Sequence, residues 1–339
     1  MMKQHSSANL PGGKKMKKSL LILSMFLTPF LWLVSANATD FPKQKISIVV
    51  PFAAGGANDI TARLVGEALS HELKAPIVIE NRPGAGSVLG TEFVARAKPD
   101  GYTLLLGGLS AIALNPTVYK ALPYDPRTDF VPLANVGEVP FVLVVNPALE
   151  AKSASELIAY AKANPRKLNM ASAGSGSPHH LFGELLASVA GFAVTHVPYR
   201  GSQIAVNDVV AGHVDMMIAD LPVAQSLIES GKLRALAVTT KRRVPNLPNV
   251  PTLDEAGVPG YEAAAWLLLL VPAKTPRSVI EALYSATNKA LATPESRRRI
   301  EKLMIPGTSA PLPDLQEFVK AEIARWEKTI NLAGLASSQ

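Results

Sequence analysis

The sequence predicts an α/β fold that is divided into two lobes. Short apolar segments typical of strands alternate with amphipathic segments of helical spacing along most of the chain. Of the 339 residues, 48% are hydrophobic and 18% are charged, a composition that provides a sizeable core and excludes a disordered or fibrous protein. A single sheet holding all of the predicted strands would be large, so we expect two lobes with the chain crossing between them.

The first 38 residues predict a cleavable secretory signal. A lysine-rich run over 14–18 precedes an apolar stretch of 15 residues, Leu20–Val34, and the small-x-small sequence Ala36–Ala38 follows. The apolar stretch is too short to span a membrane comfortably, and it contains Pro29. We therefore expect cleavage after Ala38 and export of the mature chain. Translation could start at any of three methionines, namely Met1, Met2 and Met16.

Most of the positive charge of the chain resides in this N-terminal segment. The formal charge of the whole chain is +7, and cleavage after Ala38 removes five lysines and no acidic residue, which leaves +2. A nearly neutral mature protein lacks the charge signature of nucleic-acid binding. Cysteine is absent, which excludes disulfides, thiolate metal sites, cysteine nucleophiles and a lipoprotein anchor.

Apolar runs in the first part of the mature chain predict four strands. They lie at Ile46–Val50, Pro76–Glu80, Tyr102–Leu106 and Phe141–Val145. After the first strand, apolar residues recur at spacings of four, four and five from Ile60 to Leu73, which predicts an amphipathic helix. A second helix is expected near Ser87–Ala97, after a chain break at Asn81–Gly84.

The second part begins with a capping box, in which Ser153 and Glu156 open a helix. Ser177 followed by Pro178 is a further helix start, because the hydroxyl can cap the helix and proline fits its first position; Gly191 ends this helix. The remaining strands are expected at Leu168–Ala171, Thr195–Tyr199, Val214–Ile218, Leu233–Thr239 and Ala263–Val271. A proline-rich connection precedes the last strand, and the C-terminal helices are expected at Ser278–Leu291, Pro294–Met304 and Pro313–Leu332.

Three strand-to-helix turns consist mainly of small residues: Ala53–Gly56, Ala173–Ser177 and Arg200–Ser202. Small residues let a ligand approach the backbone, and free N–H groups at a helix N-terminus favour an anion. In an open α/β sheet such turns lie at the carboxyl ends of the strands, where ligands bind. The side-chain donors are those of Asn58, Ser172, Ser175, Ser177 and Ser202, with Arg200 as the one cation, unless it is merely a solvated turn residue. This modest positive field fits a small organic acid better than a polyphosphate, and neither nucleotide-binding glycine fingerprint is present.

Other interpretations of these loops stay open. His179 and His180 are adjacent at a helix start and so point in different directions; no acidic residue stands nearby at ligand-like spacing, and we expect no metal site. Ser175 lacks the spacing of a nucleophile elbow, although an exported hydrolase or transferase that uses this loop is the alternative function. Asp59 is interpreted as a charge that complements the helix dipole, with ligand contact as the alternative. Asp220 can cap a helix or face a ligand.

Longer motifs follow one another through the mature chain. They are VPFAAGGAND at 50–59 with Ala62-Arg63, VIENRPGAG at 78–86, PDGYTLL at 99–105, LPYD at 122–125, SGSPHHL at 175–181, HVPYRG at 196–201, VDMM at 214–217, KLRALAVT at 232–239 and VPT at 250–252. In these motifs the chain resembles the Bug-type substrate-binding proteins of the tripartite tricarboxylate transporters, over nearly its whole mature length. One departure is Ala53–Ala54, where many members carry proline. Alanine in place of proline would loosen the first loop.

The resemblance implies a type II-like periplasmic binding protein: two lobes, each a mainly parallel sheet flanked by helices, joined by a hinge. With the signal at 1–38, lobe 1 is expected at 40–138 and 246–339, and lobe 2 at 139–245. The resemblance also implies a receptor without catalytic residues, cofactor or metal, which captures a small organic carboxylate and delivers it to the membrane permease subunits. We expect a monomer that binds no nucleic acid, and a ligand-presenting sensor component is a further alternative.

By the same resemblance, the ligand contacts come from the first loop and from loops of the second lobe. The expected ligand-binding residues are Phe52, Ala53, Ala54, Gly55, Gly56, Asn58, Asp59, Ser110, Ala173, Gly174, Ser175, Gly176, Ser177, Tyr199, Arg200, Gly201, Ala205 and Asp220. A ligand that contacts both lobes binds the closed state better than the open state, and so shifts the population toward closure.

Overall fold

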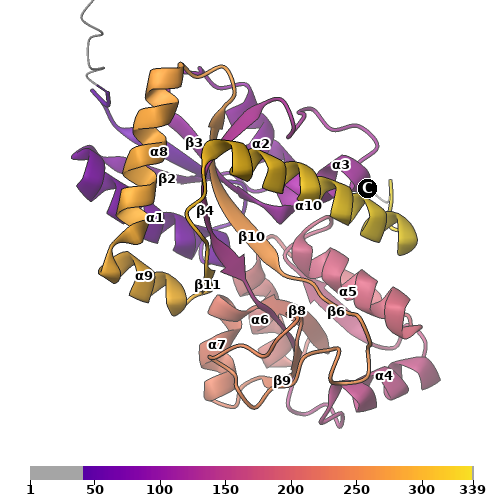
Figure 1. Ribbon diagram of the computed structural model, residues 1–339. Coiled ribbons are helices and arrows are strands. Elements are labelled where there is room, and N and C mark those ends of the chain that lie inside the picture. The colour runs from indigo at the N-terminus through magenta and orange to yellow at the C-terminus, as the bar shows by residue number, and fades with distance from the viewer. Residues whose placement is uncertain (1–40, 338–339) are drawn as a thin grey trace, which may run out of the picture. The chain divides into compact units, whose positions relative to one another are not determined.

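The computed structural model describes residues 41–337 (Figure 1). The expected signal peptide and its cleavage site lie outside these residues. The described chain forms two lobes, each built on one sheet with helices packed against it. Between residues 41 and 337, no helix combines the length and the apolar character needed to cross a lipid bilayer.

The first lobe contains a six-stranded sheet. Its strands are β1 Ile46–Val50, β2 Ile77–Asn81, β3 Thr103–Gly108, β4 Phe130–Val139, β10 Ala265–Pro272 and β11 Ile305–Pro306. Their order across the sheet is β11-β4-β10-β3-β1-β2. Every residue of β10 is buried, because this strand lies in the middle of the sheet between β3 and β4.

Helices from both ends of the described chain cover this sheet. They are α1 Ala57–Leu73, α2 Val88–Ala95, α8 Arg277–Ala292, α9 Pro294–Glu301 and α10 Leu312–Leu332. A 3-10 turn spans Ala85–Ser87, and a π-helical segment, Ser110–Leu114, continues into the short helix α3 Asn115–Val118. α1 and α8 lie side by side, although they are far apart in the sequence (Figure 1).

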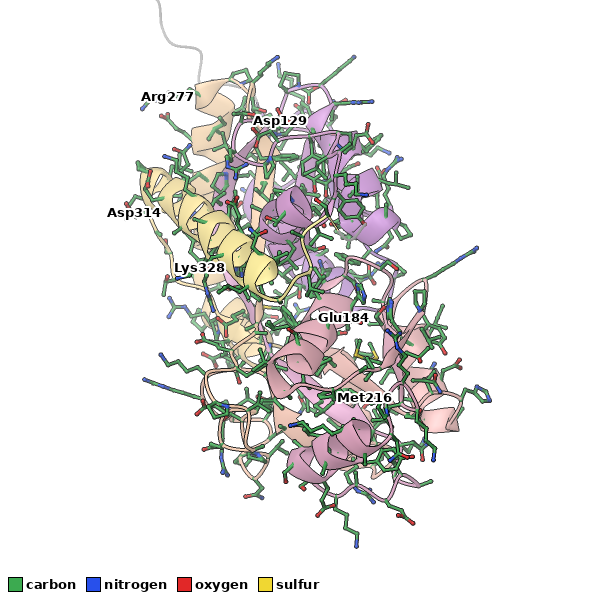
Figure 2. All side chains as sticks on the ribbon, turned by 90° about the vertical axis from the view of Figure 1, so that its right-hand side faces the viewer. Asp129, Glu184, Met216, Arg277, Asp314 and Lys328 are labelled. Carbon is green, nitrogen blue, oxygen red and sulfur yellow. The ribbon has the colours of Figure 1, made fainter. Side chains whose placement is uncertain are left out.

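The second lobe contains a five-stranded sheet in the order β7-β6-β8-β5-β9, with β5 Phe141–Val145, β6 Asn169–Ser172, β7 Thr195–Pro198, β8 Met216–Asp220 and β9 Arg234–Val238. Its helices are α4 Ala154–Ala163, α5 Pro178–Ala190, α6 Ser202–Ala211 and α7 Leu221–Glu229. In Figure 2, Asp129, Arg277 and Asp314 mark the first lobe, and Glu184 on α5 and Met216 on β8 mark the second.

Both predicted helix starts are confirmed. The Ser153 hydroxyl accepts a hydrogen bond from the Glu156 N–H at 3.2 Å at the start of α4. At the start of α5, the Ser177 hydroxyl accepts from the N–H of residue 180, and Pro178 occupies the first turn. α5 ends at Gly191, which has the left-handed conformation that glycine adopts without strain. The α/β fold in two lobes therefore follows from local sequence signals.

Both sheets are mixed, whereas the family resemblance implies mainly parallel ones. β1 is parallel to β2 and β3, but β10 runs antiparallel to β3 and β4. In the second sheet, β5 runs antiparallel to its neighbours β8 and β9. The reason for the direction of β5 is the way in which the chain changes lobe. β4 passes into β5 through Pro140 alone, so β5 enters the second sheet at the edge where β8 ends, with Phe141 opposite Asp220.

The ten-residue strand β4 has no counterpart among the predicted elements. Pro132, Asn135 and Gly137 interrupt its apolar pattern, and the pairing with β10 shifts register twice along its length. An apolar pattern that is interrupted in this way gives only a weak strand signal in the sequence. Burial between β10 and β11 compensates for it in the folded protein.

The proline-rich connection stays beside the second sheet before the chain returns to the first. The Val238 N–H donates to the Pro251 carbonyl, and the Ala263 N–H donates to the Thr239 carbonyl, both at the end of β9. The chain then enters β10 of the first sheet at Ala265. The predicted lobe limits at 138–139 and 245–246 remain a prediction.

Candidate ligand-binding site

Two neighbouring cavities lie between the lobes. The inner cavity has a volume of about 30 Å³ and the outer cavity has a volume of about 620 Å³. They adjoin, because Phe52, Ala53 and Ala173 line both. The outer cavity has the size of a typical small-molecule site, whereas the inner cavity holds about one water molecule. Together they form the candidate ligand-binding site.

Most of the predicted ligand-binding residues line one of these cavities. The inner cavity is lined by Phe52, Ala53, Gly56, Asn58, Ser110, Ala173, Gly201 and Asp220. Gly174, Ser175, Tyr199 and Arg200 line the outer cavity. Ala54, Gly55, Asp59, Gly176, Ser177 and Ala205 line neither of the two. The structure thus brings the three predicted turns together around one site, and the contact of each residue with a ligand remains a prediction.

Asp59 stabilises the first loop from behind. Its carboxylate accepts a hydrogen bond from the Gly55 N–H at 3.0 Å and is paired with Arg63 at 2.9 Å. Burial acts to raise the pKa of the Asp59 carboxyl, but the hydrogen bonds from Arg63 and Gly55 outweigh burial and hold this pKa below its usual value. Asp59 therefore fixes the turn that carries Gly56 into the inner cavity, in line with a role at the helix start.

Loops of the two lobes contact each other across the site. The Ser110 hydroxyl in the first lobe lies 2.9 Å from the Gly86 carbonyl and 3.2 Å from the Gly176 carbonyl of the second lobe. Gly86 has a φ of +56°, and a Cβ on it would lie 2.8 Å from the Ser175 carbonyl oxygen. Glycine is therefore required here both by the backbone conformation and by the close approach of the neighbouring loop.

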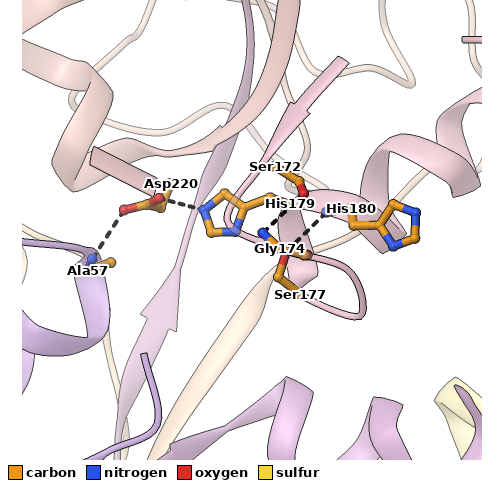
Figure 3. Close-up of polar contacts among 7 residues, drawn as sticks. All are labelled: Ala57, Ser172, Gly174, Ser177, His179, His180 and Asp220. Carbon is orange, nitrogen blue, oxygen red and sulfur yellow. Dashed lines mark hydrogen bonds and ion pairs between the residues drawn. The ribbon is translucent and has the colours of Figure 1, made fainter. Parts of the chain in front are cut away.

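His179 and Asp220 form a buried pair in the wall of the inner cavity (Figure 3). The His179 Nε2 lies 2.6 Å from the Asp220 Oδ1, and the other carboxylate oxygen accepts from the Ala57 N–H at 3.2 Å. Ala57 begins α1, so Asp220 joins the second lobe to the first. The ring of Phe141 packs edge-on against the imidazole at 5.0 Å.

The sequence spacing around the adjacent histidines did not indicate this pair. Asp220 is 41 residues from His179 in the sequence and meets it only because the end of β8 lies beside the start of α5. No hydrogen-bond partner reaches the His179 Nδ1 from any described residue. Over residues 41–337, no three histidine, aspartate or glutamate side chains gather in a way that could hold a metal ion.

His180 points away from its neighbour, as the sequence predicts. Its ring stacks on His196 with 3.9 Å between centroids, and its Nδ1 accepts from the Gly176 N–H at 3.3 Å. Burial, and for His180 also the neighbouring His196, lowers the pKa of both imidazoles to about 4. The Nε2 of His196 is 2.6 Å from the Ser172 hydroxyl, so the two rings support the glycine-serine loop at Ser172 and at Gly176.

Sequence reasoning missed further parts of the cavity walls. Residues 83–87, interpreted as a turn and helix start, line the outer cavity together with Tyr119. Trp266, which falls in the strand expected at Ala263–Val271, lines the inner cavity, and its indole N–H donates to Glu322 at 2.6 Å. Two signals were available in the sequence. Glycines with an unusual spacing mark residues 83–87, and a histidine directly after a Ser-Pro helix start marks His179.

Apart from the Asp220 carboxylate, which is paired with His179, the electrostatic character of the inner cavity comes mainly from the backbone. Neither lysine nor arginine lines the inner cavity, but the first turns of α1 and α6 both border it. Helix N-termini carry partial positive charge and free N–H groups, which favour an anion. Arg200 is exposed at the outer cavity, and no described carboxylate forms an ion pair with it. The site can therefore accept a small anion.

Comparison with known proteins gives a consistent family match. The model of the tripartite tricarboxylate transporter family receptor matches residues 61–335. A solved structure of Rpa4515 from R. palustris with adipate is 38% identical and covers 88% of this chain and 99% of that chain, with a TM-score of 0.84. The periplasmic binding protein BugD is 36% identical with a TM-score of 0.83, and the two coverages are 87% and 99%. MatC from Rhodopseudomonas palustris with bound malate is 35% identical with a TM-score of 0.81, and the coverages are 86% and 100%.

Proposed function

Since this chain belongs to the tripartite tricarboxylate transporter receptor family, we propose that it captures a small organic carboxylate between its two lobes for delivery to a membrane permease. The family consists of periplasmic solute receptors and not of enzymes. Two solved relatives are described with adipate and with malate, which are both dicarboxylates. We propose a dicarboxylate as the ligand class of this chain.

The observation that carries this proposal is the convergence of small-residue turns from both lobes on one pair of cavities. Gly56 precedes α1 in the first lobe, and Gly201 precedes α6 in the second. The two turns approach each other closely, since a Cβ on Gly201 would lie 2.9 Å from the Cβ of Ala53. This close approach supports a site built from backbone N–H groups. Backbone donors at two helix N-termini suit a carboxylate group.

The two cavities suggest how a dicarboxylate would lie. One carboxylate would occupy the inner cavity, between the first turns of α1 and α6. The chain of the ligand would extend into the outer cavity, where Arg200 supplies a cation for the second carboxylate. The inner cavity has to widen from its volume of about 30 Å³ to receive a carboxylate.

The proposal also includes the processing of the chain, its oligomeric state and the limits of its lobes. The signal is cleaved after Ala38 in the periplasm, and the mature protein acts as a monomer. Lobe 1 comprises residues 40–138 and 246–339, and lobe 2 comprises residues 139–245. The closed, liganded form is the one that the permease subunits recognise, because a ligand that bridges the lobes favours closure.

A thermal-shift screen of the mature protein tests the proposal. Dicarboxylates of increasing chain length, malate and adipate among them, are compared with monocarboxylates, phosphate and neutral diols. Binding to the native state alone raises the melting temperature in proportion to the logarithm of ligand concentration. We expect at least one dicarboxylate to give such a shift and its diol to give none. A response to phosphate or to neutral compounds, with no response to any carboxylate, would contradict the proposal.

A further inference from the structure

We infer that His179 is a specificity-determining ligand contact, which binds an anionic oxygen of the ligand together with a proton. The inference rests on the proposed function, because it concerns the same site. Its starting point is the free Nδ1 of His179 in the wall of the inner cavity. The side chain is only 9% exposed. A buried ring nitrogen without a partner costs free energy, and a ligand in the cavity can supply that partner.

The contact with Asp220 determines what this ligand atom can be. The Asp220 carboxylate accepts at His179 Nε2, which therefore carries a hydrogen. In the neutral imidazole, Nδ1 then has a lone pair, which repels a carboxylate oxygen that approaches it. In the protonated imidazole, both ring nitrogens donate. A carboxylate ligand can thus be bound at Nδ1 only by the cationic ring.

The charge of the inner cavity favours the same conclusion. Asp220 and His179 are the ionisable side chains among its lining residues, and no lysine or arginine faces the ligand there. A second carboxylate beside Asp220 would be repelled strongly in this buried place. An imidazolium between the two carboxylates removes the repulsion. The ligand anion and the proton, which is taken from solvent, are therefore bound cooperatively.

No other ionisable group on the neighbouring elements replaces His179 in this role. On α1, Asp59 is paired with Arg63 and turned toward its own loop. The neighbouring His180 on α5 faces His196. On β5, the group next to the imidazole is the uncharged ring of Phe141.

The elements that close the inner cavity from the other sides present uncharged groups to it as well. β10 contributes Trp266, β3 and the π-helical segment contribute residues 108–110, and α6 contributes Ser202. Glu322 on α10 accepts from the Trp266 indole and lines a different cavity. The proton that accompanies the ligand is therefore assigned to His179.

Isothermal titration calorimetry of the mature protein measures this proton directly. Adipate and malate are titrated in Hepes and in Tris, which differ in ionisation enthalpy, between about pH 6 and about pH 9. The difference in observed enthalpy gives the number of protons taken up per ligand. We expect uptake to rise toward one proton at alkaline pH, where the dissociation constant should increase by up to about tenfold per pH unit.

The variant His179→Gln tests whether the proton that is taken up with the ligand binds to His179. Glutamine can donate to Asp220 but cannot take up a proton, so the buffer dependence should vanish and the affinity should no longer vary with pH. The matched control is His213→Gln, because His213 is an exposed histidine of the same lobe that lies outside both cavities. In this control the uptake should be that of the unmodified protein.

A second measurement needs no substitution. Nitrogen-15 chemical shifts of the histidine rings in the unmodified protein report the protonation of each nitrogen. We expect both nitrogens of His179 to carry hydrogen in the adipate- or malate-bound form at a pH where the free form does not. Binding without proton uptake, or a bound His179 that stays neutral, would overturn the inference alone. Absence of binding by every dicarboxylate from pH 6 to pH 9 would instead contradict the proposed function.

Discussion

Arg200 is the one lysine or arginine among the described residues that line the two cavities. It faces the outer cavity from the turn before α6 and has no described carboxylate partner. If it binds the second carboxylate, Arg200→Ala should weaken binding of a dicarboxylate by about 1–3 kcal/mol. Calorimetry measures this loss, and a monocarboxylate should lose much less. Arg242→Ala, at an exposed position outside both cavities, is the matched control.

An Arg200→Ala variant with the dicarboxylate affinity of the unmodified protein would reduce Arg200 to a solvated turn residue. The other residue-scale feature, the contact of His179 with Asp220, could not be predicted from the sequence. Its partners are 41 positions apart, and their meeting depends on the packing of β8 against α5. The sequence indicated only that Asp220 follows a strand and that His179 stands at the start of a helix, both at the ligand-binding edge.

At the scale of elements, the loop between β6 and α5 depends on Gly176. Its φ is +75°, and a Cβ on it would lie 2.8 Å from the Tyr119 hydroxyl oxygen. Gly191 at the end of α5 has a similar φ of +70°, but nothing lies within 4 Å of its Cβ position. The two positions therefore share a backbone requirement, and only Gly176 adds a steric one.

This difference predicts unequal effects of alanine. Gly191→Ala should destabilise the protein by about 1–2 kcal/mol, the cost of the left-handed conformation for a residue with a Cβ. Gly176→Ala should cost more and should also weaken ligand binding, because the loop lines the outer cavity. In the Tyr119→Phe background the additional cost should shrink. Urea denaturation gives these values, and equal losses for Gly176→Ala and Gly191→Ala would contradict the proposed contact.

The stacked pair of His180 on α5 and His196 on β7 predicts a sensitivity to acid. Both folded-state pKa values are about 4, whereas an unfolded histidine has a pKa of about 6.5. Between these values the unfolded chain binds more protons than the folded protein. The free energy of unfolding should therefore rise as the pH increases from about 4 to about 6.5, and remain level above that range with respect to these groups.

Denaturation curves at several pH values test this slope. His196→Gln keeps a hydrogen-bonding group near Ser172 and should make the slope shallower, whereas His71→Gln, at an exposed position on α1, should leave it unchanged. Identical slopes in the His196→Gln variant and in the unmodified protein would show that these rings do not determine the acid sensitivity.

Most elements were predictable because their signals are local. The capping hydroxyls of Ser153 and Ser177 and the compact apolar strands such as β1 lie where the sequence indicates. Strand β4 was not predictable because polar residues, proline and glycine interrupt its apolar pattern. The antiparallel insertion of β10 was not predictable because its partners β3 and β4 lie in distant parts of the chain. Strand direction follows from the route of the chain between lobes, which no local pattern encodes.

At the scale of the whole molecule, two polar contacts join the lobes at the candidate site. The Asp220 carboxylate accepts from the Ala57 N–H, and the Ser110 hydroxyl contacts the Gly176 carbonyl. The contact with Ala57 holds Asp220 at the N-terminus of α1, a position that itself favours an anion. An incoming carboxylate has to share this position, and His179 is the group that makes sharing possible.

The most direct measurement is a crystal structure of the mature protein grown with a saturating dicarboxylate identified by the screen. The account predicts closed lobes with one carboxylate among the turns at Gly56 and Gly201, an oxygen within hydrogen-bond distance of His179 Nδ1, and the other end toward Arg200. A ligand bound outside these cavities, or one whose inner end is uncharged, would contradict the account.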